Sequence, residues 1–341
     1  MRVDGKEIGN NNPVYFVAEI GSNYMNFDEA KTLIDIAVDI GVDAVKFQTF
    51  EADTITTKNI YFDMEITGRI RQYDLFKSFE HSKDLQRQVY EYAKQRSISV
   101  YSAPSHIKDI EFMEKIDVPV YKIGSDLACH IPLLEEVAMT GKPILLSTGL
   151  CTLDEVKDSV EAVLNIGRSQ IALYHCVSNY PTQFNEVNLR AIHTLKEVFG
   201  VPVGLSDHTV GIEISLAAVA IGSDMIERHL TFDKNAKGPD HIISLDKNEF
   251  TQLIMQSRNI EIAMGDGKKL PSCSELKNKE NNRVSIVAMQ DIPKGTIIEK
   301  HMIDIRRPGN GLEPKYLKKI IGRRAKDKML FEEPLSWKKI E

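Results

Sequence analysis

Eight short apolar runs recur over the first two thirds of the chain, and each run ends in polar or charged residues. Most segments between them are long enough for a helix. Strands that alternate with helices predict a parallel sheet, and eight such units predict an α/β protein with a closed (β/α)8 TIM barrel. The predicted strands are Val14–Gly21, Ala44–Thr49, Ile98–Pro104, Val120–Ser125, Pro143–Gly149, Ile171–Cys176, Val203–His208 and Met225–Leu230.

The segment Asn26–Gly41 illustrates the predicted helices. Its apolar residues recur at i, i+3 and i+4 and give one apolar face. Gly41 stands where such a helix is expected to stop. The same pattern predicts helices over residues 81–97, 153–167, 189–199 and 212–222. The polar stretch Glu51–Phe79 predicts a long excursion after the second strand, on the face where loops of a barrel often cover the site.

The composition changes near the C-terminus. Residues 265–283 are polar and Lys-rich and have few large apolar side chains, so they predict a linker. Beyond them, short apolar runs broken by turn signals predict a small β-rich module of about 58 residues, near the lower size limit for independent folding. We therefore expect a barrel domain over residues 1–264, a linker over 265–283 and a β-rich module over 284–341.

Composition and charge narrow the class of protein. The 341 residues are 42% hydrophobic and 27% charged, which is typical of a globular protein. The net charge of −6 argues against general nucleic-acid binding. The N-terminus has no signal-peptide core, and we find no apolar run of membrane-spanning length, so we expect a cytoplasmic protein that does not bind membranes. The four cysteines form no CxxC pair and no metal-ligand spacing, which predicts reduced thiols; they are Cys129, Cys151, Cys176 and Cys273.

The ends of the predicted strands carry many polar side chains. Such side chains are not expected in a packed apolar core, because burying a polar group without a hydrogen-bond partner costs free energy. In a (β/α)8 barrel these ends form the active site, so the pattern predicts an enzyme. The polar residues are Glu19, Lys46, Gln48, Ser102, Lys122, Ser125, Ser147, Ser206, His208, Glu227 and His229.

Two histidines end neighbouring predicted strands and suggest a metal site. Adjacent strands lie about 4.8 Å apart, so His208 and His229 at matching heights can share one ion and leave positions open for water and substrate. Alternation places Ser206 on the face of His208, and Glu227 on that of His229. Imidazole ligands favour Mn, Fe, Co or Zn over Mg or Ca. The alternative is two unrelated buried histidines.

Lys46 and Lys122 lie inside otherwise apolar strands, where a lysine needs a partner or a chemical role. Together with nearby hydroxyl groups they predict a pocket for a phosphate and a carboxylate. Two alternatives stay open, namely a structural ion pair with Glu19 or Glu227, and a Schiff-base lysine. The hydroxyl groups in question are those of Ser125, Ser147 and Ser206.

Two acidic residues complete the candidate chemistry. Glu19 is a candidate general base or water-positioning carboxylate. Asp240, in the turn Gly238–His241 after the last strand, is expected over the barrel mouth, although the turn alone is ordinary. The chain has no GxGxxG, P-loop, HExxH or GxSxG motif, which argues against nucleotide-dependent, zincin and serine-hydrolase chemistry.

Nine short strings in this order resemble the sialic acid (N-acetylneuraminate) synthase family, the phosphoenolpyruvate-condensing nonulosonate synthases. They are AEIGSN, VKFQTF, YKIGS, LLSTG, HC with YPT, GLSDHT, ERHLT, GPDH and RPGNG. The resemblance covers essentially the whole chain. It implies a TIM barrel followed by a small antifreeze-like (SAF) domain. It also implies a homodimer in which that domain covers the partner's active site.

The resemblance assigns roles to individual residues. Lys46, Lys122, Ser125, Ser147 and Ser206 are implied to bind phosphoenolpyruvate. His208 and His229 are implied to hold a divalent metal, with Mn²⁺ the expected ion. Glu19 is the implied acid/base or water-orienting group. The residues implied to contact the acceptor sugar are Gln48, Tyr180, Glu227, Asp240 and, across the dimer, Arg307. We count Glu19, Lys46, Lys122 and Asp240 as the predicted catalytic residues.

Two positions depart from the family pattern. Ala103 stands where the family often has threonine, so one hydroxyl contact to phosphate is missing or is moved to Ser102 or Ser105. Ser178 stands where some relatives carry asparagine, and it is predicted to contact substrate. In the implied reaction C3 of phosphoenolpyruvate attacks the aldehyde of an open-chain N-acetylated hexosamine, water adds at C2, and phosphate leaves by C–O cleavage.

Several functions remain open from the sequence. With N-acetylmannosamine as acceptor the products are N-acetylneuraminate and phosphate. A legionaminate or pseudaminate synthase uses a 2,4-diacetamido-2,4,6-trideoxyhexose instead, and we expect residues 51–79 and the loop after the sixth strand to decide between acceptors. A metal-dependent pyruvate aldolase and a sugar-binding module without catalysis are the remaining alternatives.

Overall fold

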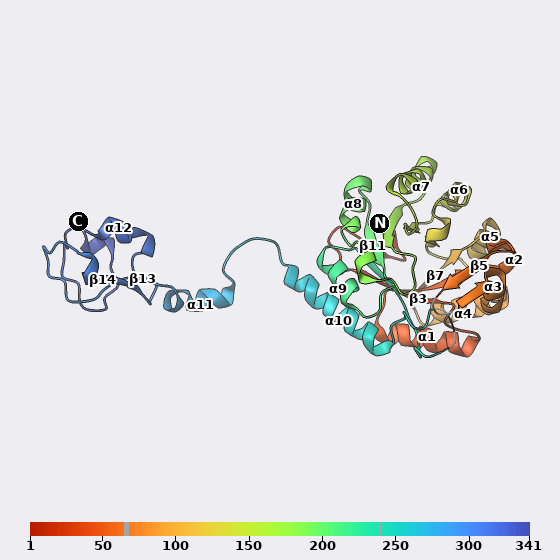
Figure 1. Cartoon of the computed structure of the whole chain (residues 1–341), viewed down its shortest axis with the longest axis horizontal. Helices are drawn as coiled ribbons and strands as arrows, with labels where there is room; N and C mark the ends of the chain where they lie inside the picture. Colours follow the sequence, from red (N-terminus) through yellow and green to blue (C-terminus); the bar gives the residue numbers. More distant parts are fainter. Residues whose placement is uncertain (65–67, 237, 239) are drawn as a thin grey trace. The chain divides into compact units, whose positions relative to one another are not determined.

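Eight parallel strands close into a barrel in the computed structural model, which describes residues 1–64, 68–236, 238 and 240–341. The strands follow one another around the barrel in chain order (Figure 1). Each lies within one of the eight predicted apolar runs, so the predicted (β/α)8 barrel is confirmed. The barrel strands are β3 (Tyr15–Gly21), β4 (Ala44–Thr49), β7 (Ser99–Pro104), β8 (Tyr121–Ile123), β9 (Ile144–Ser147), β10 (Ile171–Cys176), β11 (Val203–Ser206) and β12 (Met225–His229).

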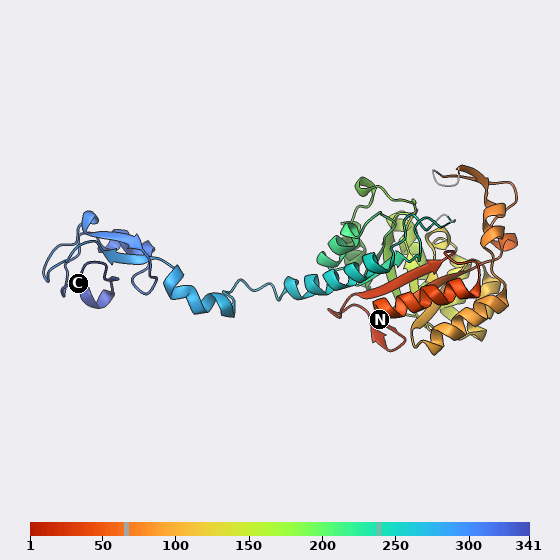
Figure 2. The same ribbon diagram turned by 90° about the horizontal axis from the view of Figure 1, so that it is seen from below.

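Helices alternate with these strands and cover the outside of the barrel. In the first of them the Asn26 side chain accepts a hydrogen bond from the amide of Glu29, and Gly41 ends the helix at φ 81°, as the pattern predicts. α10 lies beside α1 (Figure 2). The barrel helices are α1 (Phe27–Ile40), α4 (Lys83–Gln95), α5 (Ile107–Lys115), α6 (Ile131–Met139), α7 (Leu153–Ile166), α8 (Ala191–Phe199), α9 (Glu213–Ala220) and α10 (Lys247–Met264).

The polar excursion after β4 contains regular structure of its own. Its elements are α2 (Ala52–Ile55), an antiparallel hairpin of β5 (Tyr61–Met64) and β6 (Gly68–Arg71), and α3 (Gln72–Phe79). Phe76 packs against Phe50 and Phe62, with ring centroids 5.6 and 5.9 Å apart, and this aromatic cluster stabilises the excursion. Residues 65–67 of the predicted excursion lie outside the described residues.

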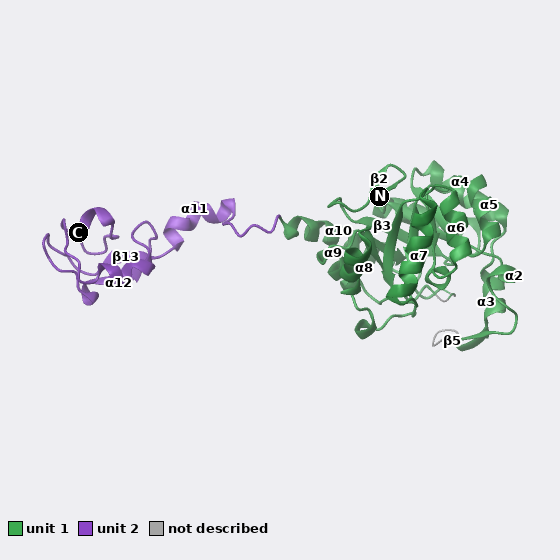
Figure 3. Ribbon diagram, turned by 90° about the horizontal axis from the view of Figure 1, so that it is seen from above, with its two compact units in different colours: residues 1–265 green, residues 266–341 purple. Residues whose placement is uncertain are grey.

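The chain divides into two compact units, Met1–Gly265 and Asp266–Glu341 (Figure 3). A short hairpin of β1 (Arg2–Val3) and β2 (Lys6–Glu7) begins the first unit, and Val3 and Ile8 belong to its core. Within the described residues, no helix has both the length and the apolar character needed to cross a membrane.

The second unit has its own small core. Helix α11 (Cys273–Asn282), which buries no residue, lies in the segment predicted as a linker. β13 (Ser285–Ala288) pairs antiparallel with β14 (Ile303–Arg306), and α12 (Leu317–Ile320) follows. The buried core residues are Ile286, Ala288, Ile292, Ile298, Ile303, Ile320, Ala325, Met329, Leu335 and Ile340.

Candidate active site

A buried cluster of four charged side chains lies at the carboxyl ends of the barrel strands. Lys46 on β4 places its Nζ 2.7 Å from Glu227 Oε1 on β12 and 3.3 Å from Glu19 Oε2 on β3. Lys122 on β8 places its Nζ 3.7 Å from the same Glu227 oxygen. None of the four residues is more than 6% exposed. Charges this deeply buried persist only when they are paired, so the two lysines and two glutamates form one electrostatic unit.

Polar side chains from neighbouring strands join this cluster. Lys122 donates a hydrogen bond to Ser147 Oγ at 2.5 Å, and Ser206 Oγ donates to Glu227 Oε1 at 3.2 Å. Gln48 Nε2 donates to Glu19 Oε1 at 2.9 Å. The structure therefore brings together seven of the predicted site residues: Glu19, Lys46, Gln48, Lys122, Ser147, Ser206 and Glu227.

Gly21 explains how the Glu19 carboxylate reaches this position. The pairing of β3 with β4 is irregular between Glu19 and Gly21, where Gly21 adopts φ 51°. A Cβ atom on Gly21 would stand 2.8 Å from Glu19 Oε1 and 3.2 Å from Gln48 Nε2. Any other residue would therefore strain the backbone and push the carboxylate away from Lys46.

Gly149 allows Ser125 and Ser178, two residues predicted for the site, to approach each other. The amide of Gly149 donates a hydrogen bond to Ser125 Oγ at 3.0 Å. A Cβ atom on Gly149 would lie 2.7 Å from Ser125 Oγ and 2.6 Å from Ser178 Oγ. The loops after β8, β9 and β10 thus meet at this glycine, with Ser125 and Ser178 beside it.

Ser102, which was predicted to contact substrate, does not join the charged cluster. It is paired in register with Phe47, whereas its neighbours Tyr101 and Ala103 are paired with the site residues Lys46 and Gln48. Paired residues of adjacent strands lie on the same face, so Ser102 points outward. Its hydroxyl lies 2.8 Å from Thr49 Oγ1, which itself donates to Gln86 Oε1 on α4. Ser102 therefore belongs to the contact between the barrel and α4.

The two predicted histidines lie together above the charged cluster. The rings of His208 and His229 are buried, and their centroids are 5.5 Å apart. The ring of Tyr180 lies 4.2 Å from that of His208 and 6.3 Å from that of His229, centroid to centroid. Asp240 Oδ2 lies 3.6 Å from His229 Nδ1. All four residues were predicted for the site, and the structure brings them to one place.

Hydrogen bonding orients the His208 ring. Its Nδ1 lies 2.9 Å from the Val177 carbonyl oxygen, which only accepts, so Nδ1 carries the proton. In the neutral ring the lone pair is then on Nε2, the arrangement usual for a metal-ligating histidine. Burial and, when it is protonated, the charge of His208 lower the pKa of His229, whose Nδ1 is buried and has no hydrogen-bond partner among the described residues. His229 can therefore offer a neutral nitrogen to a cation. Burial would lower the pKa of His208, but the Cys176 sulfur and the Val177 carbonyl outweigh burial and raise it, so His208 offers its Nε2 lone pair only after it loses its proton.

This donor set fits a divalent transition metal in an open site. Neutral imidazole nitrogens are typical ligands of Mn, Fe, Co and Zn. Among the residues that the structure describes, no three His, Cys, Asp or Glu side chains form a complete ligand set. An ion held by two histidines would take its remaining ligands from water and substrate, which is the arrangement of a catalytic rather than a structural site.

The two glutamates of the cluster differ in their acidity. Burial, together with the charge of Glu227, raises the pKa of Glu19 to about 7, although Lys46 opposes the shift. Burial would also raise the pKa of Glu227, but Lys122 and Lys46 outweigh it and lower it to about 2. Two carboxyl groups whose pKa values are pushed apart often divide acid/base and electrostatic roles. Of the two glutamates, Glu19 is thus the one able to exchange a proton near neutral pH, while Glu227 stays ionised.

A buried ion pair between Arg228 and Asp207 supports the site, and the sequence pattern did not predict it. Arg228 is fully buried and donates to Asp207 Oδ2 at 2.6 Å and to the carbonyls of Thr209 and Ile243 at 2.7 and 3.2 Å. It stands between Glu227 and His229 on the opposite face of β12. The sequence feature that could have predicted the pair is an arginine inside an apolar strand, with Asp207 directly after the neighbouring strand. The pair ties the ends of β11 and β12 to the segment after Asp240.

Arg307 lies in the second unit, directly after β14, and is exposed. Its role in a partner's site, and the homodimer itself, stay predictions. The predicted turn Gly238–His241 includes residue 239, which lies outside the described residues.

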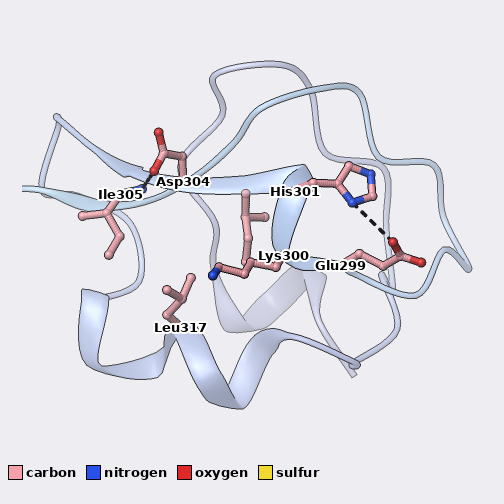
Figure 4. A pocket seen from close by; sticks show the side chains of 7 residues that line it. Glu299, Lys300, His301, Asp304, Ile305 and Leu317 are labelled. Carbon is pink, nitrogen blue, oxygen red and sulfur yellow. Dashed lines mark hydrogen bonds and ion pairs between the residues drawn. The ribbon is translucent and has the colours of Figure 1, made fainter.

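The second unit also carries a cavity of about 570 Å³ (Figure 4). Its ion pair, between His301 Nδ1 and Glu299 Oε2 at 3.3 Å, joins side chains that are more than 60% exposed. Such groups are solvated, unlike the buried charges of the barrel, so the candidate active site is in the barrel. The lining residues are Glu299, Lys300, His301, Ile303, Asp304, Ile305 and Leu317.

A (β/α)8 barrel with desolvated, perturbed acid/base groups at the carboxyl ends of its strands is the architecture of an enzyme. Residues 33–269 match the NeuB family, and residues 283–341 match the SAF domain. The chain therefore belongs to the NeuB family. This confirms both the family resemblance and the predicted antifreeze-like domain.

Relatives with assigned names make the class of enzyme more specific. The chain is 39% identical over 316 residues to the N,N'-diacetyllegionaminic acid synthase of Campylobacter jejuni, covering 91% of this chain and 95% of the relative. It is 34% identical over 337 residues to a C. jejuni pseudaminic acid synthase, covering 96% and 98%. The crystal structure of N-acetylneuraminic acid synthetase from Leptospira borgpetersenii in complex with citrate is 33% identical, with a TM-score of 0.74, covering 82% of this chain and 94% of that one. The predicted synthase class is thus confirmed, while the relatives differ in the sugar acid that they are named for.

Proposed function

We propose that this protein is a nonulosonic acid synthase that condenses phosphoenolpyruvate with the open-chain form of an N-acetylated hexosamine and releases phosphate. The observation that carries the proposal is the pair of buried lysines, Lys46 and Lys122, beneath two imidazoles. A substrate with a phosphate and a carboxylate needs cationic donors shielded from water. A pyruvate aldolase would need neither the second lysine nor the surrounding hydroxyl groups.

The acceptor that we propose first is N-acetylmannosamine, which gives N-acetylneuraminate. A 2,4-diacetamido-2,4,6-trideoxyhexose is the second candidate, giving a legionaminate or pseudaminate. The 39% identity to a legionaminic acid synthase supports this second acceptor, and the 33% identity to an N-acetylneuraminic acid synthetase supports the first. The excursion over residues 51–79 and the loop after β10 are the segments that we expect to discriminate between the two sugars.

The proposed phosphoenolpyruvate pocket uses the two lysines and the hydroxyl groups of Ser125, Ser147 and Ser206. His208 and His229 would hold a divalent ion, for which we propose Mn²⁺. When bound, this ion supplies Lewis-acid polarisation of the acceptor aldehyde. We expect Tyr180, Asp240 and Ser178 to contact the sugar. Glu227 Oε2 is buried and has no hydrogen-bond partner among the described residues, which supports a ligand at this position, because such atoms normally have a partner.

The residues of the pocket have different roles in the proposed reaction. Lys46 and Lys122 hold the phosphate and carboxylate and stabilise the charge on the departing phosphate. After C3 of phosphoenolpyruvate has attacked the aldehyde, Glu19 accepts a proton from the water that adds at C2. Gln48 fixes the orientation of Glu19 through the hydrogen bond to Oε1. Glu227, kept ionised by the lysines, holds Lys46 in place.

Phosphate release tests the proposal. We expect the purified protein to release phosphate from phosphoenolpyruvate in the presence of Mn²⁺ and one of the two sugars, and to stop when the metal is chelated. Release with N-acetylmannosamine alone identifies a sialic acid synthase, and release with the diacetamido sugar alone identifies a legionaminate or pseudaminate synthase. Formation of product from pyruvate, with no phosphate release from phosphoenolpyruvate, would overturn the proposal.

The pH dependence of turnover tests the role of Glu19. Because a general base must be deprotonated, we expect kcat to rise with pH through an apparent pKa near 7, the value to which burial raises the pKa of Glu19. Glu19→Gln should lower kcat by about a hundredfold or more and remove this limb of the profile. Steady-state assays on both sides of neutral pH measure both effects. Glu197→Gln, at an exposed position on α8, is the control. An unchanged acidic limb in Glu19→Gln would assign the titration to another group.

A further inference from the structure

Two cysteine thiols lie side by side on neighbouring loops of the first unit. Cys129 Sγ and Cys151 Sγ are 3.8 Å apart, although 22 positions separate them in the sequence. Cys129 is exposed in the loop after the short 3₁₀ helix η1 (Ser125–Leu127), and Cys151 is half-buried in the loop after β9. Cys176 is buried and Cys273 lies on α11. The sequence spacing, with no CxxC motif, gave no sign of this pair.

Hydrogen bonds on both sides hold the two loops together. Ser159 Oγ on α7 donates to the Ala128 carbonyl at 2.8 Å, next to Cys129. The Gly149 amide donates to Ser125 Oγ at 3.0 Å, near Cys151. A disulfide bond is about 2.05 Å long, so the sulfur atoms need to approach by less than about 2 Å to form one. The fold therefore keeps the thiols close without joining them.

We propose that Cys129 and Cys151 form a redox modification site, in which a peroxide converts the two thiols into a disulfide that weakens substrate binding at the barrel mouth. The exposed Cys129 is the sulfur that a peroxide reaches first. Burial and the neighbouring thiol raise the pKa of Cys151 to about 12, so Cys151 stays protonated until it resolves the intermediate.

The chemistry balances in two steps. The Cys129 thiolate attacks one peroxide oxygen, the O–O bond breaks, and the departing hydroxide takes up a proton to become water, which leaves a sulfenic acid on Cys129. The Cys151 sulfur then attacks the sulfenic sulfur, the S–O bond breaks, and the hydroxyl leaves with the Cys151 proton as a second water. Two sulfur atoms lose two electrons in total, and one hydrogen peroxide is reduced to two waters. A dithiol reductant reverses the modification by exchange.

The site is coupled to the barrel mouth through short stretches of chain. Ser125 precedes Cys129 by four positions, and Gly149 precedes Cys151 by two. Gly149 has no room for a Cβ atom between Ser125 and Ser178. We expect that drawing the sulfur atoms together shifts Ser125 relative to Gly149, because short stretches of chain connect each of them to one of the cysteines. This step rests on the proposed function, in which Ser125 binds phosphoenolpyruvate. Since a misplacement of about 1 Å can cost up to a hundredfold, we expect the KM for phosphoenolpyruvate to rise about tenfold in the oxidised protein.

Mass spectrometry tests the disulfide without reference to activity. The full-length protein is treated with a small excess of hydrogen peroxide, and its intact mass and proteolytic peptides are determined. We expect the loss of two hydrogen atoms and a cross-linked peptide pair that contains Cys129 and Cys151, both reversed by dithiothreitol. Cys129→Ser and Cys151→Ser should abolish the cross-link, whereas the matched control Cys273→Ser should retain it. Two thiols that stay free, overoxidise without a cross-link, or bond only between molecules would overturn the proposal.

Kinetics then test the coupling. The KM for phosphoenolpyruvate is compared between oxidised, reduced and re-reduced protein, with Cys151→Ser under the same treatment as the control. A rise that appears only in the cross-linked protein and reverses on reduction supports the coupling, and an unchanged KM in fully cross-linked protein refutes it. Absence of turnover from reduced protein with every acceptor would refute the proposed function instead, and the mass measurement would still decide whether the disulfide forms.

Discussion

Replacing His229 with alanine is expected to abolish Mn²⁺ binding and to lower turnover by about a thousandfold or more. Two imidazoles are the only protein ligands that we propose for the ion, so losing one removes half of the protein's coordination. Lewis-acid stabilisation is worth several kcal/mol, and about 1.4 kcal/mol corresponds to a tenfold change in rate. The ring lies at the end of β12, and within the part of the chain that the structure describes its Nδ1 has no hydrogen-bond partner, so the variant should remain folded.

Three measurements on the same preparation check this result. Electron paramagnetic resonance follows free Mn²⁺ during titration, phosphate release gives the turnover, and circular dichroism confirms the fold. His193→Ala, at an exposed position on α8, is the matched control and should behave like the unsubstituted protein. Full turnover of His229→Ala after removal of all metal would show that the two histidines do not hold a catalytic ion.

Features encoded by local pattern could be predicted from the sequence. The apolar runs correspond to the barrel strands because side chains inside and outside a parallel barrel are both buried, which makes each strand a continuous apolar segment. The helix over Phe27–Ile40 follows from its apolar spacing, its Asn26 cap and Gly41. Lys46 and Lys122 stood out for the same reason, because a lysine interrupts such a run only when the fold pairs it.

Features that depend on register or on distant parts of the chain could not be predicted in this way. Ser102 was assigned to the site because it stands near a strand end, but only the pairing of Phe47 with Ser102 shows that it faces outward. A shift of one position exchanges the two faces of a strand. The 3.8 Å approach of Cys129 to Cys151 depends on how two loops pack. The difference in acidity between Glu19 and Glu227 likewise depends on lysines from two other strands.

The Arg228–Asp207 pair leads to the largest stability effect that we expect. Arg228→Met should lower the free energy of unfolding by about 3–5 kcal/mol at neutral pH, because it leaves the Asp207 carboxylate buried without its counter-ion. Arg228 and Asp207 are 0% and 2% exposed, so water cannot replace the lost partner. The carbonyls of Thr209 and Ile243 lose a donor as well. Urea unfolding followed by circular dichroism measures the loss, and Arg87→Met, on the surface of α4, serves as the control.

Acidic pH separates the charge effect from a simple packing defect. Burial alone raises the pKa of Asp207, but Arg228 and the hydrogen bonds from Ser215 and Thr209 outweigh it and lower the pKa. A carboxyl group with a lowered pKa contributes stability above its unfolded pKa of about 4, and this contribution is lost as the pH falls. Without Arg228, we expect burial to outweigh the remaining hydrogen bonds and to raise the pKa of Asp207, so the variant should bind a proton there and its deficit should shrink at mildly acidic pH. Asp207→Asn in the Arg228→Met background should recover part of the loss at neutral pH, because no charge is then left unpaired. A deficit that is equal at both pH values and unchanged in the double variant would attribute the effect to lost packing around Arg228 rather than to the buried charge.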